Sequence, residues 1–233
     1  MYMTHTQLDE ISDDSILWRY MDLLKFINIF TTNKIWFNRI DKFEDVYEGT
    51  FPTANEKYRD KYYPEGQIPK ETYNQIEKCT QSRLFVYCLH ENDYESAAMW
   101  SLYGKENGLA IKTTGKNLKE CFSVEQENIY ITKVSYIDYE KDFLPEGNAF
   151  YLGTHKRKSF YYENEIRGLC LIQNRTPSKE EAGIYIAVDI AKLIQEIYIS
   201  PYAPSYMVDT VKNLLERYKY SIPVIKSSLY KTN

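Results

Sequence analysis

The chain has 233 residues, of which 43% are hydrophobic and 27% charged, and its 29 Lys and Arg against 33 Asp and Glu leave a formal net charge of −4. This composition excludes a disordered or fibrous chain, and the slight acidity argues against broad nucleic-acid binding through a basic face. The apolar runs are far shorter than the roughly 20 residues of a membrane span, and the polar, acidic start lacks the pattern of a secretory signal. We therefore expect a globular, cytoplasmic protein without a membrane contact.

The first half of the chain alternates short apolar runs with polar segments. The spacing of the apolar residues predicts these elements: a strand at 16–21, a helix over 22–31 with Asp22 as its cap, and strands at 34–38, 83–89 and 108–113, with a helix over 94–103. Residues 39–49 are expected to form a polar, acidic loop or turn. Segment 50–80, rich in Tyr, Lys and Glu, is predicted to be an insertion with a helix near 70–80.

The second half continues without a regular strand–helix–strand alternation and without an internal repeat. Its predicted strands are 129–139, 161–173, 183–189, 197–201 and 223–227, and its predicted helices are 115–121, 148–160, 190–194 and 205–218. Strands of mixed spacing with interspersed helices indicate an α+β fold of mixed and antiparallel strands. We expect residues 1–233 to form a single domain.

Cysteine and histidine spacing gives no sign of a metal site. The four cysteines lie apart without CxxC spacing, so a disulfide framework or a zinc ribbon is not expected. The one local cluster, His90 to Asp93, follows a predicted strand and is better explained as a polar turn than as a ligand set. We therefore expect no metal cofactor.

The most informative stretch contains Glu163, Glu165 and Arg167. If 161–173 is one strand, these three side chains share a face, and the two glutamates project about 6.6 Å apart. Such a carboxylate pair suits acid–base catalysis or the stabilisation of a developing cation. The alternative is a solvated outer face of ordinary cross-strand ion pairs, and both interpretations remain open.

Two further features could contribute to a site. Arg19 interrupts an apolar predicted strand, and a strand-borne arginine can hold phosphate or carboxylate in a bidentate manner, although pairing with a structural acid explains it equally well. Trp100 and Tyr103 share one face of the 94–103 helix. Rings at this spacing are usually core residues, but one of them could form the floor of a base or nicotinamide pocket.

Taken in chain order, several of these segments resemble the family known as domain of unknown function 2971, found in bacteria and their mobile elements. The resemblance covers nearly the whole chain and rests on the following segments: Leu17 to Tyr20, Ile35 to Phe37, Phe43 to Asp45, Tyr47 to Gly49, Val86 to Leu89, Met99 to Gly104, Gly108 to Ile111, Val134 to Tyr136, Lys158 through Glu163 to Arg167, and Glu196 to Pro201. It implies a single α+β domain with a polar pocket, and it supplies no reaction.

The order of parts also resembles, more loosely, that of ADP-ribosyltransferase-like toxins and modifiers. The resemblance implies that Arg19 holds NAD, that Trp36 or Tyr47 stacks on the nicotinamide ring, and that Glu165 is the catalytic carboxylate with Glu163 as its partner. Three further residues are candidates for contact with the same nucleotide: Trp100, Tyr103 and Arg167.

The leading hypothesis is therefore a bacterial or phage-derived enzyme of the toxin or defence type. It would move ADP-ribose from NAD to a protein, a nucleic acid or water, with no metal. A second hypothesis is a nucleotide-sensing or protein-binding accessory module without turnover. A third is a metal-dependent nuclease or phosphodiesterase using Asp45, Glu48, Glu163 and Glu165. Dinucleotide-fold oxidoreductases, P-loop hydrolases and serine hydrolases are disfavoured, because their glycine-rich and nucleophile motifs are absent.

Overall fold

A computed structural model describes residues 1–63, 70–174, 178 and 180–230. Its strands are β1 (Ile16–Asp22), β2 (Lys34–Arg39), β3 (Leu84–Glu91), β4 (Gly108–Thr114), β5 (Tyr130–Lys133), β6 (Ser135–Ile137), β7 (His155–Arg157), β8 (Glu165–Leu171), β9 (Gly183–Ala187), β10 (Glu196–Ile199) and β11 (Val224–Lys226). Its α-helices are α1 (Leu23–Thr32), α2 (Thr53–Tyr62), α3 (Lys70–Gln81), α4 (Ala97–Tyr103), α5 (Gly115–Cys121), α6 (Tyr151–Thr154), α7 (Ile190–Leu193) and α8 (Tyr206–Arg217). The 3₁₀ helices within the described ranges are η1 (Ile40–Lys42), η2 (Phe122–Val124) and η3 (Lys158–Glu163).

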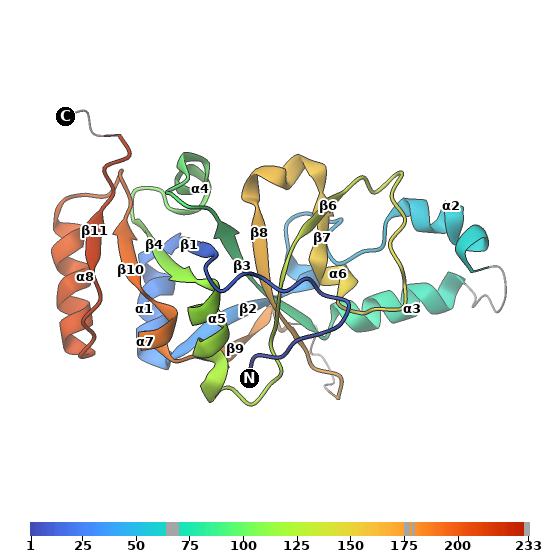
Figure 1. Ribbon diagram of the computed structural model, residues 1–233, viewed down its shortest axis with the longest axis horizontal. Helices are drawn as coiled ribbons and strands as arrows, with labels where there is room; N and C mark the ends of the chain where they lie inside the picture. Colours follow the sequence, from blue (N-terminus) through green and yellow to red (C-terminus); the bar gives the residue numbers. More distant parts are fainter. Residues whose placement is uncertain (64–69, 175–177, 179, 231–233) are drawn as a thin grey trace.

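Nine of these strands form one sheet in the order β11-β10-β4-β1-β3-β2-β9, with β8 paired to β3 and β5 paired to β8 (Figure 1). The strands pair antiparallel except β10 with β11, and β6 and β7 form a separate parallel pair. This mixed sheet with helices between its strands confirms the predicted α+β class. That the whole chain forms one domain stays a prediction.

The sheet forks at β3. One edge of β3 pairs with β1 near its end, at Trp18↔His90, and with β2 near its start, at Asn38↔Val86. Between these two points β1 and β2 diverge, and the middle of β3 borders the gap between them. The other edge of β3 pairs with β8 from Leu84↔Leu171 to His90↔Glu165. The fork matters because it opens the sheet beside the polar end of β8.

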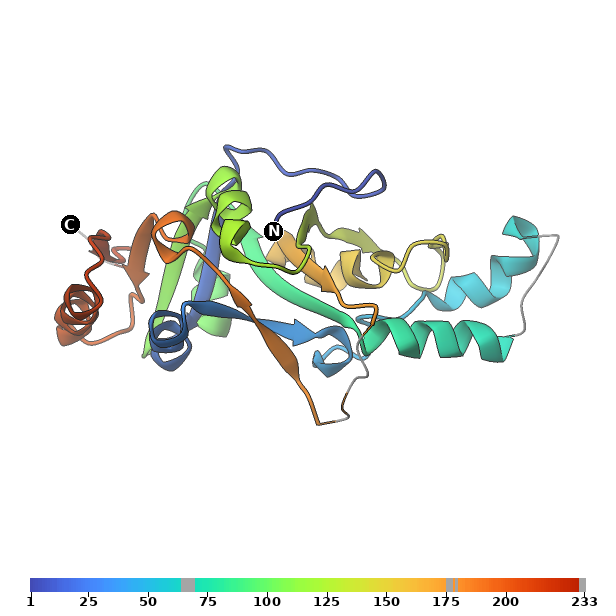
Figure 2. The same cartoon turned by 90° about the horizontal axis from the view of Figure 1, so that it is seen from below.

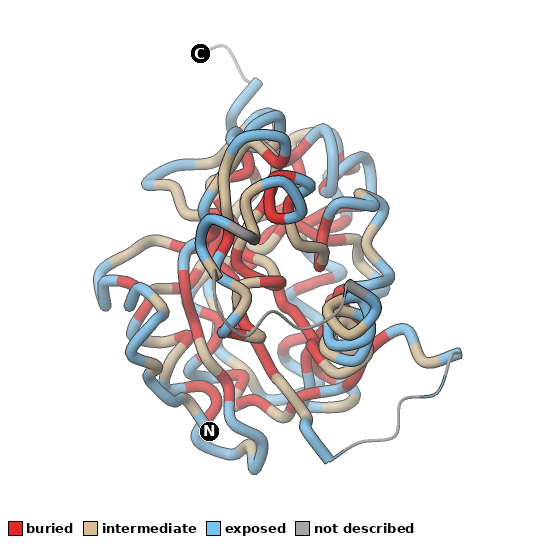
Figure 3. Tube along the Cα trace, turned by 90° about the vertical axis from the view of Figure 1, so that its right-hand side faces the viewer, coloured by how far each residue is buried: buried red, intermediate tan, exposed pale blue. Residues whose placement is uncertain are grey.

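The two faces of the sheet are covered differently. One face carries the largest core cluster, to which α1, α5 and α8 contribute buried residues such as Phe26, Leu118 and Val211. On the opposite face α4 covers a small cluster around Trp100, and a second cluster gathers beside α6. Figure 3 shows the buried segments gathered in the middle of the molecule. Because alternate residues point to opposite faces, the register partners Trp18, His90 and Glu165 share the face of α4.

The segment 50–80 is an appendage at the end of the molecule opposite α8 (Figure 2). The helix predicted near 70–80 is present as α3, whereas α2 was not predicted. Asn55 of α2 holds the appendage to the loop between β6 and α6, because its amide donates to the Leu144 carbonyl at 2.7 Å and accepts from the Leu144 N–H at 2.9 Å. Residues 64–69, in the middle of this segment, lie outside the described residues.

The structure corrects two predicted elements next to the candidate glutamates. Residues 148–160 are not one helix, because they divide into α6, β7 and the start of η3. The strand predicted for 161–173 begins only at Glu165, since η3 runs to Glu163 and Asn164 adopts a left-handed conformation with φ 36°. Strand 129–139 is also interrupted and forms β5 and β6. Over the described ranges, no helix is both long and apolar enough to cross a membrane.

Candidate functional site

A cleft of about 670 Å³ opens on the face of the sheet that carries α4. Its floor is made by residues of β1, β3 and β8, including Trp18, Cys88 and Glu165. α4 forms one wall through Met99 and Tyr103. The opposite wall comes from the loop after η1, from β7 and from η3, with the following lining residues: Phe43, Glu44, Asp45, Val46, Glu48, Lys156, Arg157, Phe160 and Glu163.

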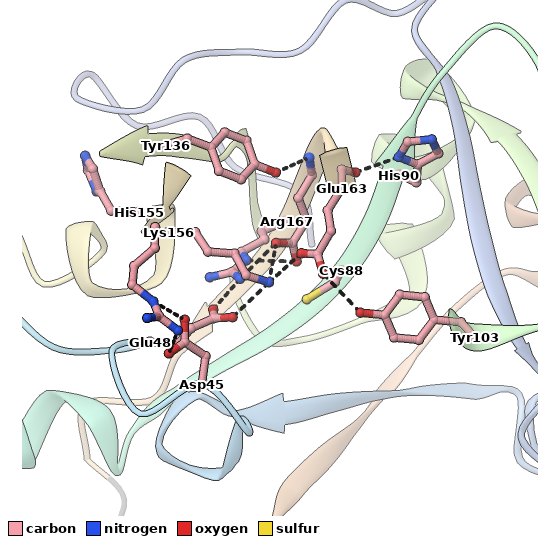
Figure 4. A network of polar contacts seen from close by, with 12 residues as sticks. Asp45, Glu48, Cys88, His90, Tyr103, Tyr136, His155, Lys156, Glu163 and Arg167 are labelled. Carbon is pink, nitrogen blue, oxygen red and sulfur yellow. Dashed lines mark hydrogen bonds and ion pairs between the residues drawn. The ribbon is translucent and has the colours of Figure 1, made fainter. Parts of the chain in front are cut away.

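A buried cluster of five charged side chains lies at this wall (Figure 4). The Lys156 ammonium pairs with Glu163, lies 3.0 Å from Glu48 Oε1 and lies 3.7 Å from Glu165 Oε2. Arg167 donates from Nε and Nη2 to the two oxygens of Glu165 at 3.0 and 2.9 Å, and Nη2 also pairs with Glu48. Three carboxylates and two cations leave one formal negative charge uncompensated in the cluster.

Four separate segments bring these groups together. Glu48 comes from the turn after η1, Lys156 from the middle of β7, Glu163 from the end of η3, and Glu165 with Arg167 from β8. Glu163 and Glu165 therefore do not lie on one strand, as the sequence predicts. Their carboxylates meet around Lys156 because the chain turns at Asn164 between them.

Hydrogen bonds with uncharged groups also hold Glu163 and Glu165 in position. The Tyr103 hydroxyl donates to Glu163 Oε1 at 3.1 Å, and the Glu165 N–H donates to the Tyr136 hydroxyl at 2.9 Å (Figure 4). His90 Nδ1 lies 2.6 Å from the Glu163 carbonyl oxygen, a contact in which the imidazole donates. Burial raises the pKa of Tyr103 and Tyr136 well above the ordinary 10.0, so both hydroxyls keep their protons in the neutral range.

The cluster keeps Glu165 ionised. Burial alone would raise the pKa of the Glu165 carboxyl, but the charges of Arg167 and Lys156 outweigh burial and hold this pKa below its ordinary 4.5. Burial would likewise lower the pKa of Lys156, and Glu165 with Glu48 raise it well above 10.5 instead. The floor of the cleft thus holds a buried carboxylate that is ionised in the neutral range.

Arg19 lies at the fork of the sheet and lines the same cleft. Its Nη1 donates to the Cys88 carbonyl at 2.8 Å, and its guanidinium lies 5.1 Å from the centre of the Tyr87 ring. Among the residues that the structure describes, no carboxylate lies within 4.0 Å of this guanidinium. By contrast, the other two basic residues at this end, Lys25 and Lys42, face Asp22 and Asp41 at 2.9 and 3.8 Å. Arg19 is the register partner of Ile111 and lies by alternation on the face opposite Trp18, so it borders the cleft at the gap between β1 and β2, with no acid partner among the described residues.

The structure brings some of the predicted aromatic residues to the cleft and not others. Tyr103 lines it. Trp36 lies on β2 against Tyr185 and donates to Asn38, and Tyr47 packs at 4.4 Å under the guanidinium of Arg157; neither is among the described lining residues. A further set of predicted contact residues is buried away from the cleft.

Trp100 and Arg167 belong to that buried set. Trp100 lies on the buried side of α4, is completely buried and donates from Nε1 to Glu95 at 2.9 Å, so it does not form the floor of the cleft. Arg167 is also completely buried, and it reaches the cleft only through its carboxylate partners. Both residues support the site from within rather than offering a surface to a ligand.

Lys156 was not among the residues expected at the site, and Glu48 was expected only as a ligand of a metal ion. Lysine is among the residues least often buried, and residues 148–160 have helical spacing, so no local signal marked Lys156 as a partner of three glutamates. The oxygens of Glu48, Glu163 and Glu165 face ammonium and guanidinium groups. Over the described part of the chain, no three or more His, Cys, Asp or Glu residues gather as metal ligands.

Comparisons with known proteins find only distant likeness. No family model matches the chain, and no curated protein matches it. Among solved structures, DarT of Thermus sp. 2.9 in complex with ADP-ribosylated ssDNA aligns at 9% identity and a TM-score of 0.42, over 95% of this chain and 98% of DarT. The complex of the same protein with carba-NAD+ aligns at 9% identity and a TM-score of 0.41, over 93% and 96%. Likeness this distant carries no argument about this chain.

Proposed function

We propose that this protein cleaves the bond between nicotinamide and ribose in NAD and transfers ADP-ribose to water or to a protein or nucleic-acid acceptor. The observation that supports it is that groups of opposite charge line one cleft. Arg19, a cation without an acid partner among the described residues, lines the cleft together with Glu163 and Glu165 of the net-negative cluster. NAD carries the complementary charges, since its pyrophosphate is anionic and its nicotinamide ring is cationic.

Each group has a role in this reaction. Arg19 holds the pyrophosphate through its free donors. Glu165 accepts a hydrogen bond from a hydroxyl of the nicotinamide ribose and stabilises the positive charge that develops on this ribose. The bond from ribose C1′ to the ring nitrogen breaks, its electron pair leaves with neutral nicotinamide, and an acceptor oxygen or nitrogen attacks C1′ and loses its proton to solvent. Tyr103 supplies an aromatic wall.

The experiment measures nicotinamide release from NAD by the purified protein, with and without chelator. Water alone, a protein mixture and a single-stranded oligonucleotide serve as acceptors. Glu165→Gln keeps the shape of the side chain and removes its charge, and we expect release to fall about 100-fold or more. Arg19→Gln should raise KM for NAD about tenfold, as expected for the loss of a charge-assisted contact. Glu196→Gln, whose carboxylate pairs with Lys112 outside the cleft, is the matched control.

The outcomes separate the alternatives. Release that survives the chelator and is lost only in the cleft variants supports the proposal. A rise in the melting temperature with NAD but no release with any acceptor supports the nucleotide-sensing module instead. Turnover that requires a divalent metal ion, or neither release nor a shift, contradicts NAD cleavage by this cleft.

A further inference from the structure

Lys156 occupies the centre of the charged cluster and is 6% exposed. Its ammonium contacts Glu163, Glu48 and Glu165, and it lies 4.6 Å from the centre of the Phe160 ring. Resting on the proposed function, we infer that Lys156 is a positioning residue, which holds the carboxylates of Glu163 and Glu165 in one fixed arrangement toward the cleft.

The two cations of the cluster divide the carboxylates unequally. Arg167 pairs with Glu165 and Glu48. For Glu163, Lys156 is the only salt-bridge partner within the part of the chain that the structure describes, and Tyr103 adds one neutral hydrogen bond. Among the residues that the structure describes, Lys156 is therefore the one cation that touches both glutamates of the cleft. Without it, two buried carboxylates would face each other across the space that the ammonium now fills.

The backbone holds Lys156 in place. Lys156 is the central residue of β7 and pairs with Tyr136 of β6 in the parallel register. The hydroxyl of Tyr136 accepts from the Glu165 N–H, so the short two-stranded sheet holds both the ammonium and the backbone of one of its partners. A long, flexible side chain thus acts from a rigid position, with its charge fixed relative to β8.

Removal of the ammonium changes the charge balance of the cluster. The groups that face the two glutamates are Lys156 from β7, Arg167 from β8, Glu48 from the loop after η1, Cys88 and His90 from β3, Tyr103 from α4, and Tyr136 from β6. Without Lys156 the three carboxylates keep only Arg167, and two formal negative charges remain uncompensated. The cluster relieves this repulsion by taking up a proton at higher pH.

The test compares Lys156→Met with Lys156→Arg. Lys119→Met, which removes a partly buried lysine of α5 that pairs with Asp13, is the matched control. The first readout is the pH dependence of nicotinamide release. The second needs no turnover: ¹³C NMR of protein labelled at the glutamate carboxyl carbons follows their titration directly. A double variant, Lys156→Met with Glu48→Gln, returns the net charge of the cluster to −1, as in the wild type. It replaces the single variant in both measurements if the single variant fails to fold.

In Lys156→Met we expect the acid limb of the pH profile, and at least one carboxyl titration, to move up by about 1–3 units. In Lys156→Arg the acid limb and the carboxyl titrations should lie near their wild-type positions, with kcat still reduced. In the double variant they should lie between those of wild type and Lys156→Met. Unchanged titrations in Lys156→Met would overturn the inference even if wild-type protein cleaves NAD. Where the single variant does not fold, titrations in the double variant equal to those of Glu48→Gln alone would overturn it. Absence of release by the wild type contradicts the proposed function, while the NMR titrations still decide the role of Lys156.

Discussion

At the residue scale, one backbone conformation decides how the two glutamates meet. Asn164 adopts φ 36° and ψ 61°, and its side-chain amide donates to the Glu91 carbonyl at 2.6 Å. Asparagine tolerates this left-handed region better than most residues, and the hydrogen bond from its side-chain amide to β3 anchors the turn. The strand pattern at 161–167 predicts that Glu163 and Glu165 share a face by alternation. The structure instead brings them together through this turn.

This conformation gives the first prediction. Asn164→Val should lower the free energy of unfolding by about 1–3 kcal/mol, because a β-branched residue is strained at positive φ and the side-chain hydrogen bond to Glu91 is lost. Asn164→Gly relieves the strain and loses only the hydrogen bond, so it should cost less. Chemical denaturation of the three proteins measures the difference. Equal stabilities of the valine and glycine variants would contradict the conformation of this residue.

Residue patterns anticipated some members of the site and not others. Arg19, Glu163, Glu165 and Tyr103 were candidates from the sequence, and the structure places all four at one cleft. Their roles stay predictions until tested. The position of Lys156 could not be predicted, because its three partners lie on segments separated by up to about a hundred residues of chain, and only the packing of those segments makes it buried.

At the element scale, periodicity worked best where an element has one buried face. α1 carries Phe26, Ile29 and Phe30 on its buried side and Asp22 as its cap, which accepts from the Lys25 N–H at 2.8 Å. The prediction for this helix is confirmed. The predictions at 148–164 were wrong, because α6, β7 and η3 have only 4, 3 and 6 residues, and segments this short do not repeat a hydrophobic pattern often enough to identify it.

The one-sided burial of α1 gives the second prediction. Phe26 is completely buried in the large core cluster, with its ring centre 4.8 Å from that of Phe30, whereas Leu24 on the same helix is 78% exposed. Phe26→Ala should destabilise the protein by about 3–5 kcal/mol, because it leaves a cavity under the sheet. Leu24→Ala should change stability by less than about 0.5 kcal/mol. Thermal unfolding compares them, and similar losses would contradict the assigned core face.

At the scale of the whole molecule, buried ionisable groups set the pH range of stability. The folded-state pKa of Glu165 lies below its ordinary 4.5, so its contribution is complete above that pH and is lost as the pH falls further. We therefore predict a fall in melting temperature below about pH 4.5 that is smaller in Glu165→Gln, once the lower starting stability of that variant is subtracted. An identical acid slope in both proteins would argue against a charged Glu165 in the folded state.

Buried tyrosines set the alkaline limit in the opposite sense. Burial raises the pKa of Tyr87 to about 12, and Tyr20 and Tyr139 are raised as well. These groups ionise more readily in the unfolded chain, whose tyrosines titrate near 10.0, so stability is full below that pH and falls as the pH rises through 12. Tyr87→Phe should flatten this fall in a melting series from pH 9 to about pH 12. A slope equal to that of the wild type would count against the buried, neutral phenol.

The sequence by itself determined the class of fold, most of its elements and the candidate site residues. It could do so because hydrophobic periodicity, helix caps and residue type are signals that can be read from a few neighbouring positions. Only the tertiary structure decided which of these residues meet. The fork of β1 and β2 on β3 brings Arg19 to the cleft, and the turn at Asn164 places Glu163 and Glu165 beside Lys156. Register and packing between distant segments set these contacts, so the spacing of residues within any one segment does not indicate them.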